Sequence, residues 1–456
     1  MENKEFLGTA PVGRLLWRLA IPTVLAQLVN MLYNIVDRIY IGRMPLDGDL
    51  ALTGVGLCMP IILIVSAFAA LVGGGGAPRA SIFMGQKRME EAEEAMGGCF
   101  TMLLVTSAAL TAALLLWNRE FLMAFGGSDN TIEYAVGYMN IYALGTVFVQ
   151  LTLGMNAYIS AQGFTRVSMT SVLIGAICNI ALDPLFIYGF HMGVKGAALA
   201  TILSQAISCA WVLRFLFGKK TFLRLRGRYM RLRWRVVAPC LALGMASFIM
   251  QSSESVISMC FNASLQNYGG DIAVGAMTIL TAVMQFAMLP LQGLGQGAQP
   301  ILSYNYGAGN KMRVKKAFFC LLRVSLAYSV ILWGLVELFP QVFVSLFTPN
   351  AALIEFSTLA LRIYMGGVVI FGIQVACQMA FISLGNALAS ITVAVVRKFV
   401  LLLPLIYIVP RFVADKTMGV YLAEPIADIL AVLFTSILFI FQFKKALRRM
   451  DEMQAQ

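Results

Sequence analysis

The sequence predicts an all-α, polytopic membrane protein made of two six-helix repeats. Hydrophobic residues make up 59% of the 456 positions and charged residues only 12%, whereas a soluble domain is about one quarter charged. Apolar runs of about 20 residues or more recur along nearly the whole chain. The two halves also resemble each other in sequence. Together these three observations predict a bundle of membrane-spanning helices built by internal duplication.

Twelve apolar segments are long enough to cross a bilayer as helices. Their predicted ranges are 15–42, 50–84, 92–117, 131–162, 165–190, 194–217, 236–266, 271–303, 314–339, 352–385, 387–410 and 418–443. The first segment lacks a small-residue cleavage site, so we interpret it as a retained helix and not as a signal peptide. Several segments exceed the bilayer thickness, which predicts tilt or extension beyond the hydrocarbon.

A basic connection between the sixth and seventh segments divides the chain into a first lobe (1–218), a linker (219–235) and a second lobe (236–456). The linker carries eight Lys or Arg and no acidic residue. If it is cytoplasmic, the inner loops hold 22 basic residues, Lys4 included, and the outer loops hold five. The positive-inside rule requires such an asymmetry. We therefore predict a multi-pass protein of the cell inner membrane with both termini in the cytoplasm.

Three features of the sequence could suggest a binding site, but each fits a membrane protein without one. They are the net charge of +12 (nucleic acid), the cysteines (zinc) and a glycine-rich stretch (phosphate). A lipid-headgroup or nucleic-acid patch would account for the basic linker, but topology accounts for it without a ligand, so no nucleic-acid partner is expected. The eight cysteines show no CxxC or zinc spacing, and the one histidine, His191, falls in a short loop. The glycine-rich stretch 71–85 lacks GxxxxGK[ST], which favours close helix packing over phosphate binding.

Enzymes and channels fit the sequence less well than a transporter does. HExxH, DDxxD and GxSxG constellations are absent from the sequence, so we expect neither an enzyme nor a cofactor. "TIEYAVGYMNIYALG" (131–145) aligns with "LIEFSTLALRIYMGG" (353–367) at a shift of 222 residues. Six helices separate the copies, so both run in the same direction and are related by an axis along the membrane normal. Two such lobes with a cavity between them form a transporter architecture, whereas a channel needs no difference between its lobes.

Acidic residues inside the first lobe are candidates for an ion site, because charges within a bilayer are costly and mark ion or substrate paths. Asp37 and Asp183 have apolar partners in the second half. With a helical rise of about 1.5 Å per residue, Asp37, Asp183 and Thr201 lie at a similar depth below the outer surface. Asn179 and Ala197 each lie one helical turn from a member of this set. Oxygen ligands suit a hard monovalent cation, and two neighbouring carboxylates would equally share a proton.

Structural alternatives exist for both aspartates. Asp37 could neutralise Arg38 near the interface, and Asp183 could cap a kink before Pro184. Asp183 has no adjacent base, which weakens the structural interpretation for that residue.

The second lobe holds a second set of buried charges. Glu254, near the middle of the seventh segment, would attract a cationic substrate or carry a proton, or it would join a polar cluster with the serines at 252, 253 and 255. Glu424 and Asp428 share a helical face, and Arg397 lies at a depth that allows pairing with one of them. We interpret these three as a structural ion pair between the last two segments.

Four motifs together resemble the multidrug and toxic compound extrusion (MATE) transporters. They are "LYNIVDRIYIG", "NIALDPLFIYGF…GVKGAALAT", "GQGAQPILSYNYGAGN" and "GVYLAEPIADILA". The resemblance covers nearly the whole chain and implies two six-helix bundles arranged in a V around a central cavity. It also implies a coupling-cation site, whose matching positions are Asp37, Asn179, Asp183, Thr201 and the carbonyl of Ala197.

The resemblance further relates Glu254 to a carboxylate that some MATE members pair with an aspartate of the tenth helix. Here the tenth segment carries no acid, only Gln374 and Gln378, which departs from that pattern. Glu254, Gln374 and Gln378 are our candidates for a substrate site in the second lobe. We expect a cation-coupled antiporter, driven by H⁺ or Na⁺, that exports organic cations and drugs by alternating access and functions as a monomer. The alternative is a flippase for lipid-linked saccharides from the same broader superfamily.

Overall fold

The computed structural model describes residues 5–44 and 48–455, and these residues are almost entirely helical, with no strand among them. Ten of the described helices are long and apolar enough to span a membrane, and one bent helix pair adds an eleventh span. One of the ten, α8 (Trp234–Gly307), has 74 residues and is interrupted by Gly270, whose φ of 62° is not helical. Counted as two spans, α8 brings the described total to the twelve that the sequence predicts.

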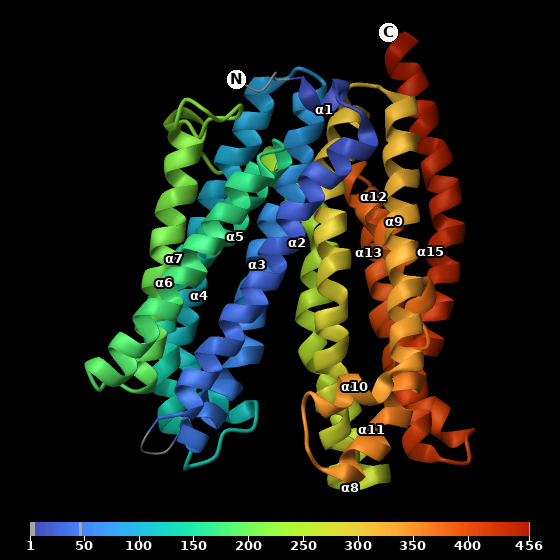
Figure 1. Ribbon diagram of the computed structural model, residues 1–456. Helices are drawn as coiled ribbons and strands as arrows, with labels where there is room; N and C mark the ends of the chain where they lie inside the picture. The colour runs from blue at the N-terminus through green and yellow to red at the C-terminus, as the bar shows by residue number, and fades with distance from the viewer. Residues whose placement is uncertain (1–4, 45–47, 456) are drawn as a thin grey trace.

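The first lobe contains the helices that precede the linker. They are α1 (Phe6–Thr9), α2 (Val12–Gly42), α3 (Gly48–Gly85), α4 (Met89–Ala124), α5 (Ile132–Ala161), α6 (Thr165–Pro184) with the π-helical turn η1 (Leu185–Gly189), and α7 (Val194–Phe217). In Figure 1 this lobe runs from blue to green and leans away from the second lobe at the end opposite the termini.

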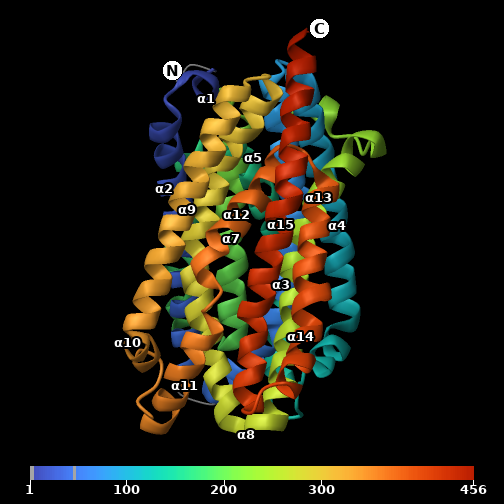
Figure 2. The same ribbon diagram turned by 90° about the vertical axis from the view of Figure 1, so that its right-hand side faces the viewer.

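The second lobe follows the short 3-10 helix η2 (Gly227–Tyr229) of the linker. Its elements after α8 are α9 (Lys311–Leu338), α10 (Pro340–Ser345), α11 (Ala351–Tyr364), α12 (Val368–Ser383), α13 (Ala387–Val395), η3 (Val396–Leu402), α14 (Leu403–Ile408), η4 (Val409–Arg411) and α15 (Lys416–Ala455). Figure 2 shows α15 crossing the whole length of this lobe.

The predicted helix 352–385 is broken in the structure, which corrects the expectation of a continuous span. Helices α11 and α12 meet at an angle of 48°. The break contains Gly366 and Gly367, and a Cβ at Gly367 would lie 2.8 Å from the Cβ of Asp428. Helix α15 therefore passes too close to the break for a larger side chain, and the paired glycines lower the cost of leaving helical geometry.

Two predicted helices are interrupted by π-helical turns beside a proline. The turn η1 follows Pro184, and the turn η3 precedes Pro404. Because proline lacks an amide hydrogen and crowds the preceding turn, the ladder of hydrogen bonds shifts near it. Both halves of the chain therefore carry a π-helical turn next to a proline, after it in the first lobe and before it in the second.

The lobes pack tightly against each other near the end that carries both termini, which we call the terminal end. A Cβ at Gly75 would lie 1.9 Å from the carbonyl oxygen of Cys240, and a Cβ at Gly244 would lie 1.8 Å from that of Leu71. Glycine is therefore required for this backbone approach between α3 and α8. Toward the opposite end the ribbons of the two lobes diverge (Figure 1).

The N-terminal segment adds a second link between the lobes at the terminal end. Asn305 donates a hydrogen bond to the carbonyl of Leu7 at 3.0 Å. The guanidinium of Arg313 donates to the carbonyls of Leu7 and Ala10 at 3.1 and 2.7 Å. Phe6 packs against Gly163 of the first lobe. Residues 6–10 thus contact both lobes at once.

The linker is folded onto the first lobe. The Oε1 atom of Gln162 accepts hydrogen bonds at 2.8 Å from the Thr221 hydroxyl and from the amides of Phe222 and Leu223. Farther along the linker, Arg226 pairs with Glu93 at 3.0 Å. Arg228 and Arg233 continue these contacts with Glu90 and Glu94 at 3.3 and 2.6 Å, so residues 221–233 lie on the surface of the first lobe.

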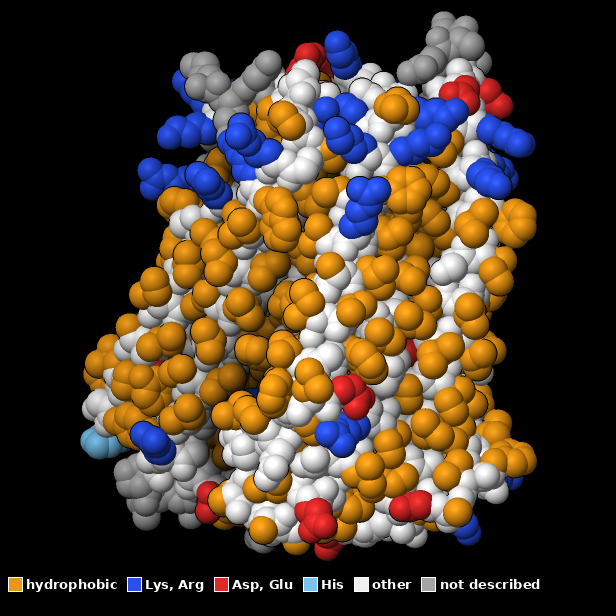
Figure 3. All heavy atoms as spheres, turned by 45° about the vertical axis from the view of Figure 1, so that its right-hand side comes forward, with side chains coloured by type: hydrophobic (Ala, Val, Ile, Leu, Met, Phe, Trp, Pro, Cys, Tyr) orange, Lys and Arg blue, Asp and Glu red, His pale blue; other side chains and the backbone are white. Residues whose placement is uncertain are grey.

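On the face that Figure 3 shows, basic side chains gather around the terminal end and apolar side chains cover the flank below it. This distribution is that of a protein crossing a bilayer along its long axis. Lys4, one of the basic residues assigned to the inner loops, lies outside the described residues.

Candidate functional site

Three helices of the first lobe bring the predicted ion-site residues together. Asn179 and Asp183 lie one turn apart on α6, and the amide of Asn179 donates to Asp183 Oδ1 at 3.3 Å. The same amide contacts the hydroxyl of Thr201 on α7 at 3.5 Å. That hydroxyl donates to the carbonyl of Ala197 at 3.0 Å. Helix α2 supplies Asp37, which interacts directly with Asp183.

The oxygen atoms of this cluster are available to a cation. Asp37 Oδ1, Asn179 Oδ1 and Asp183 Oδ2 are buried and have no hydrogen-bond partner within the described residues. The Asp183 side chain is fully buried. Buried oxygens without donors are unfavourable unless something supplies positive charge or hydrogen bonds. The donor set is all oxygen, so it fits a hard monovalent cation or a proton.

The structural alternatives for the two aspartates find little support in the geometry. Among the described ion pairs, none joins Asp37 to Arg38, although the Arg38 charge acts on Asp37 from a distance. Asp183 accepts from the Asn179 side chain, and no backbone cap by Asp183 is present in the described part of the chain. Both aspartates therefore face each other across α2 and α6.

Two tyrosines that the sequence analysis did not select line the same cluster. Tyr33, one turn before Asp37 on α2, interacts electrostatically with both aspartates. Tyr138 of α5 interacts with Asp37 and forms a hydrogen bond with Thr201. The spacing of Tyr33 from Asp37 was visible in the sequence as an i, i+4 pair, whereas the approach of α5 was not.

A small pocket of about 50 Å³ adjoins the cluster. It shares Tyr33, Asn179 and Thr201 with the cluster. The other lining residues are Asn30, Thr152, Leu153, Asn156, Ser171, Val172, Gly175, Ala176, Ser204, Gln205 and Ser208. The first lobe thus contains a pocket with several hydroxyl and amide side chains next to its paired carboxylates.

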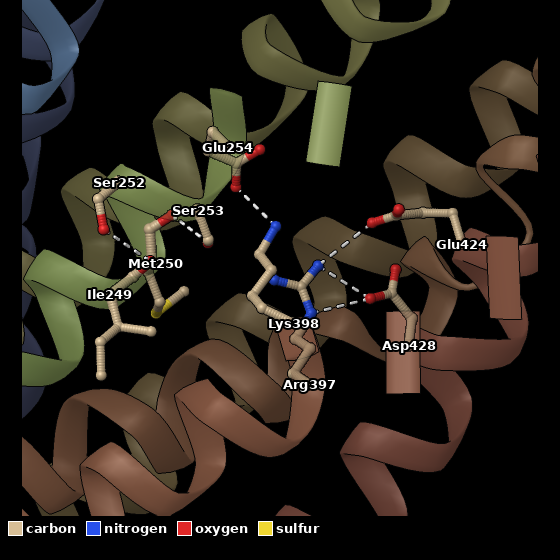
Figure 4. Close-up of polar contacts among 9 residues, drawn as sticks. All are labelled: Ile249, Met250, Ser252, Ser253, Glu254, Arg397, Lys398, Glu424 and Asp428. Atoms are coloured by element: carbon tan, nitrogen blue, oxygen red, sulfur yellow. Dashed lines mark hydrogen bonds and ion pairs between the residues drawn. The ribbon is translucent and has the colours of Figure 1, made fainter. Parts of the chain in front are cut away.

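The second lobe contains a separate ionic cluster (Figure 4). The ammonium of Lys398 donates to Glu254 Oε1 at 2.6 Å. The neighbouring Arg397 donates to Asp428 Oδ1 through Nε at 3.0 Å and through Nη2 at 2.9 Å. Its contact with Glu424 Oε1 is longer, at 3.5 Å. Three carboxyl groups therefore meet two basic groups in one cluster.

Glu254 does not join the serine cluster that the sequence offered as its structural alternative, and its role as a substrate or proton site stays a prediction. The hydroxyls of Ser252 and Ser253 donate to backbone carbonyls of their own helix, as Figure 4 shows. Lys398, which the sequence analysis overlooked, is the partner of Glu254. A second basic residue directly after Arg397 in an apolar run was the available signal.

Gln374 and Gln378 are buried in α12 but do not contact Glu254 within the described residues. Gln378 donates to the hydroxyl of Ser390 at 2.8 Å, and Gln374 Oε1 has no partner in the described chain. The two glutamines therefore do not complete a site around Glu254.

Comparison with known proteins places the chain in a family. The MatE family model matches residues 22–185 and 246–408. The multidrug export protein MepA of Staphylococcus haemolyticus is 24% identical over 373 residues, covering 82% of this chain and 81% of MepA. The FAD transporter of Shewanella oneidensis is 23% identical over 438 residues, covering 94% of this chain and 95% of that protein.

Solved structures show the same fold. A MATE family transporter in an outward-facing conformation superposes with a TM-score of 0.90 at 21% identity, covering 98% of this chain and 99% of that one. A transporter from Pyrococcus furiosus, described as having a binding pocket of reversed polarity, gives 0.91 with the same coverage and identity. The expected two-lobed helical fold and the resemblance noted in the sequence are both confirmed. The chain belongs to the MatE family of multidrug and toxic compound extrusion transporters.

Proposed function

We propose that this protein is an antiporter that exports organic cations and drugs across the cytoplasmic membrane, driven by H⁺ or Na⁺ entering through the first lobe. The observation that carries the proposal is the direct contact of Asp37 with the fully buried Asp183, surrounded by oxygen atoms without donors. A pair of buried carboxyl groups is favourable only when a cation or proton accompanies it.

The coupling follows from linkage between the two ligands. A cation on Asp37 and Asp183 neutralises the first lobe's interior and removes its attraction for a cationic substrate. Ion and substrate then disfavour each other's bound state by about 1–3 kcal/mol, the usual range for coupled sites. Release of substrate on one side and of the ion on the other gives exchange by alternating access.

The relatives support export but differ in what their names say they carry. MepA is named a multidrug export protein, whereas the Shewanella protein is named an FAD transporter. At 23–24% identity neither name decides the substrate. The acidic character of the first-lobe cluster favours cations over anions for this chain.

The test is transport of ethidium into proteoliposomes under an imposed Na⁺ gradient or an imposed pH gradient. We expect one gradient to drive uptake by the wild type. Asp37→Asn and Asp183→Asn should each reduce that uptake ~10-fold or more, because the amide cannot hold the coupling charge. Asp129→Asn is a matched control, since it makes the same chemical change at an exposed residue of the loop between α4 and α5.

Full uptake by both Asn variants would rule out the first-lobe site. Absence of ethidium transport under either gradient, with folded wild-type protein, would contradict cation export and point to lipid-linked substrates.

A further inference from the structure

The second-lobe cluster includes one residue that the proposed mechanism does not use, the buried Lys398. Its side chain is 4% exposed, whereas that of its partner Glu254 is 55% exposed. The lysine therefore reaches Glu254 from inside the lobe and leaves the other side of the carboxylate open. Within the described residues the Lys398 ammonium makes this one hydrogen bond.

The open side of Glu254 faces the first lobe. Cys240, Gly244 and Ser247 on α8 contact α3 near the terminal end, and the Phe248 ring lies 5.0 Å from the ring of Phe68. Cys240, Gly244 and Ser247 lie on one face of α8. Steps of four and three residues along the same face lead to positions 251 and 254, which lie beyond the last of these contacts. Glu254 thus points into the space between the lobes.

The cluster offers Lys398 a second partner. Arg397 is held by two hydrogen bonds to Asp428, and its guanidinium lies 4.6 Å from the centre of the Phe371 ring. Glu424 has only the longer contact with Arg397, and the charge of Lys398 already acts on it. With three carboxyl groups and two basic groups, Glu424 is the acid that lacks a full partner.

The π-helical turn η3 makes this arrangement possible. Arg397 and Lys398 are consecutive, yet both side chains enter the same cluster (Figure 4). The widened turn carries both bases, and such single turns recur at functional sites in other helices.

We propose that Lys398 is a resident cation that competes with the transported cation for Glu254, and so sets the charge selectivity of the transporter. Without substrate, the ammonium of Lys398 occupies Glu254. A substrate cation arriving from the space between the lobes takes its place, and Lys398 turns to Glu424. A neutral compound cannot displace the ammonium, so the exchange admits cations selectively. This inference rests on the proposed export of organic cations.

The test measures binding of tetraphenylphosphonium to the purified full chain in detergent, with no gradient imposed. Lys398→Met removes the competitor, and we expect binding about fivefold tighter, the factor that corresponds to one partly exposed ion pair. Lys398→Arg keeps the competing charge and should bind as the wild type does. Lys398→Gln, which can still hydrogen-bond Glu254, serves if the Met variant does not fold.

Glu424→Gln separates exchange from a structural role. In the wild-type background it removes the alternative partner of Lys398, so binding should weaken. In the Lys398→Met background there is no lysine that needs an alternative partner, so Glu424→Gln should not change the binding affinity. Unchanged affinity in Lys398→Met, or equal weakening by Glu424→Gln in both backgrounds, would overturn the inference.

These outcomes are independent of the gradient experiment. A wild type that exports ethidium while Lys398→Met binds no more tightly would defeat the inference and leave the proposed function standing. A wild type that does not export would defeat the function, and the affinities of the variants would still decide whether Lys398 competes at Glu254.

Discussion

Arg397 is a buried charged residue of the second lobe with contacts on several sides. Asp428, Glu424 and the Phe371 ring surround its guanidinium, and the Asp428 side chain is almost fully buried. Removing one member of a buried pair leaves the other charge without compensation, which costs about 3–5 kcal/mol. We therefore expect Arg397→Met to lower the thermal unfolding temperature of the detergent-solubilised protein markedly.

A double variant checks this cause. Arg397→Met combined with Asp428→Leu removes both charges and should recover most of the lost stability, because apolar replacement of a whole buried pair is close to neutral. An unfolding temperature of the single variant equal to that of the wild type would show that the pair contributes nothing.

Depth along a helix explains which site residues the sequence could predict. Residue number converts directly to height in a membrane-spanning helix, so the sequence alone assigns Asp37, Asp183 and Thr201 to one level. The structure places them in one cluster, while their role as an ion site stays a prediction. Lys398 was missed because its approach to Glu254 depends on the π-helical turn and on how α8 and η3 pack. Neither can be derived from the height of a residue along its helix.

At the scale of elements, the contact of α3 with α8 holds the lobes together at the terminal end. Gly75→Ala and Gly244→Ala would each place a Cβ within 2 Å of a carbonyl oxygen across this contact. Such overpacking costs about 1–3 kcal/mol and acts only on the conformation in which these backbones touch. We expect both variants to shift the population toward open lobes at the terminal end, measured as faster alkylation of Cys240 by a membrane-permeant maleimide.

Gly13→Ala and Gly334→Ala are suitable controls, because a Cβ at either position meets nothing within 4 Å. Cys240 alkylation at the wild-type rate in Gly75→Ala and Gly244→Ala would mean that this contact does not limit opening.

The helices were largely predictable because apolar length alone identifies a span, and the twelve predicted ranges follow the observed helices closely. The interruptions were not. Gly366 and Gly367 lie in a break beside α15, whereas the glycines at 73–76 remain helical, so a glycine pair alone does not locate a break. Close packing, which the glycine-rich stretch did predict, is what the structure shows there.

For the whole molecule, the clustering of Lys and Arg at one end predicts which side of the membrane each loop occupies. We expect the linker and both termini to be cytoplasmic, because basic loops are retained on that side. Single cysteines placed at Lys220 and at His191, in a chain without other reactive cysteines, would report sidedness through an impermeant maleimide. In intact cells only the His191 position should react, and reaction at Lys220 alone would invert the topology.

The docking of the linker on Gln162 also determines where this chain could be divided into two separately made polypeptides. A cut after Gly218 would strip the first half of the segment that satisfies the buried Gln162 oxygen and pairs with Glu93. A cut near Arg231 would leave that segment in place, although it would put Arg233 and its partner Glu94 on different halves. The chain is therefore better divided near the end of the linker than at its beginning.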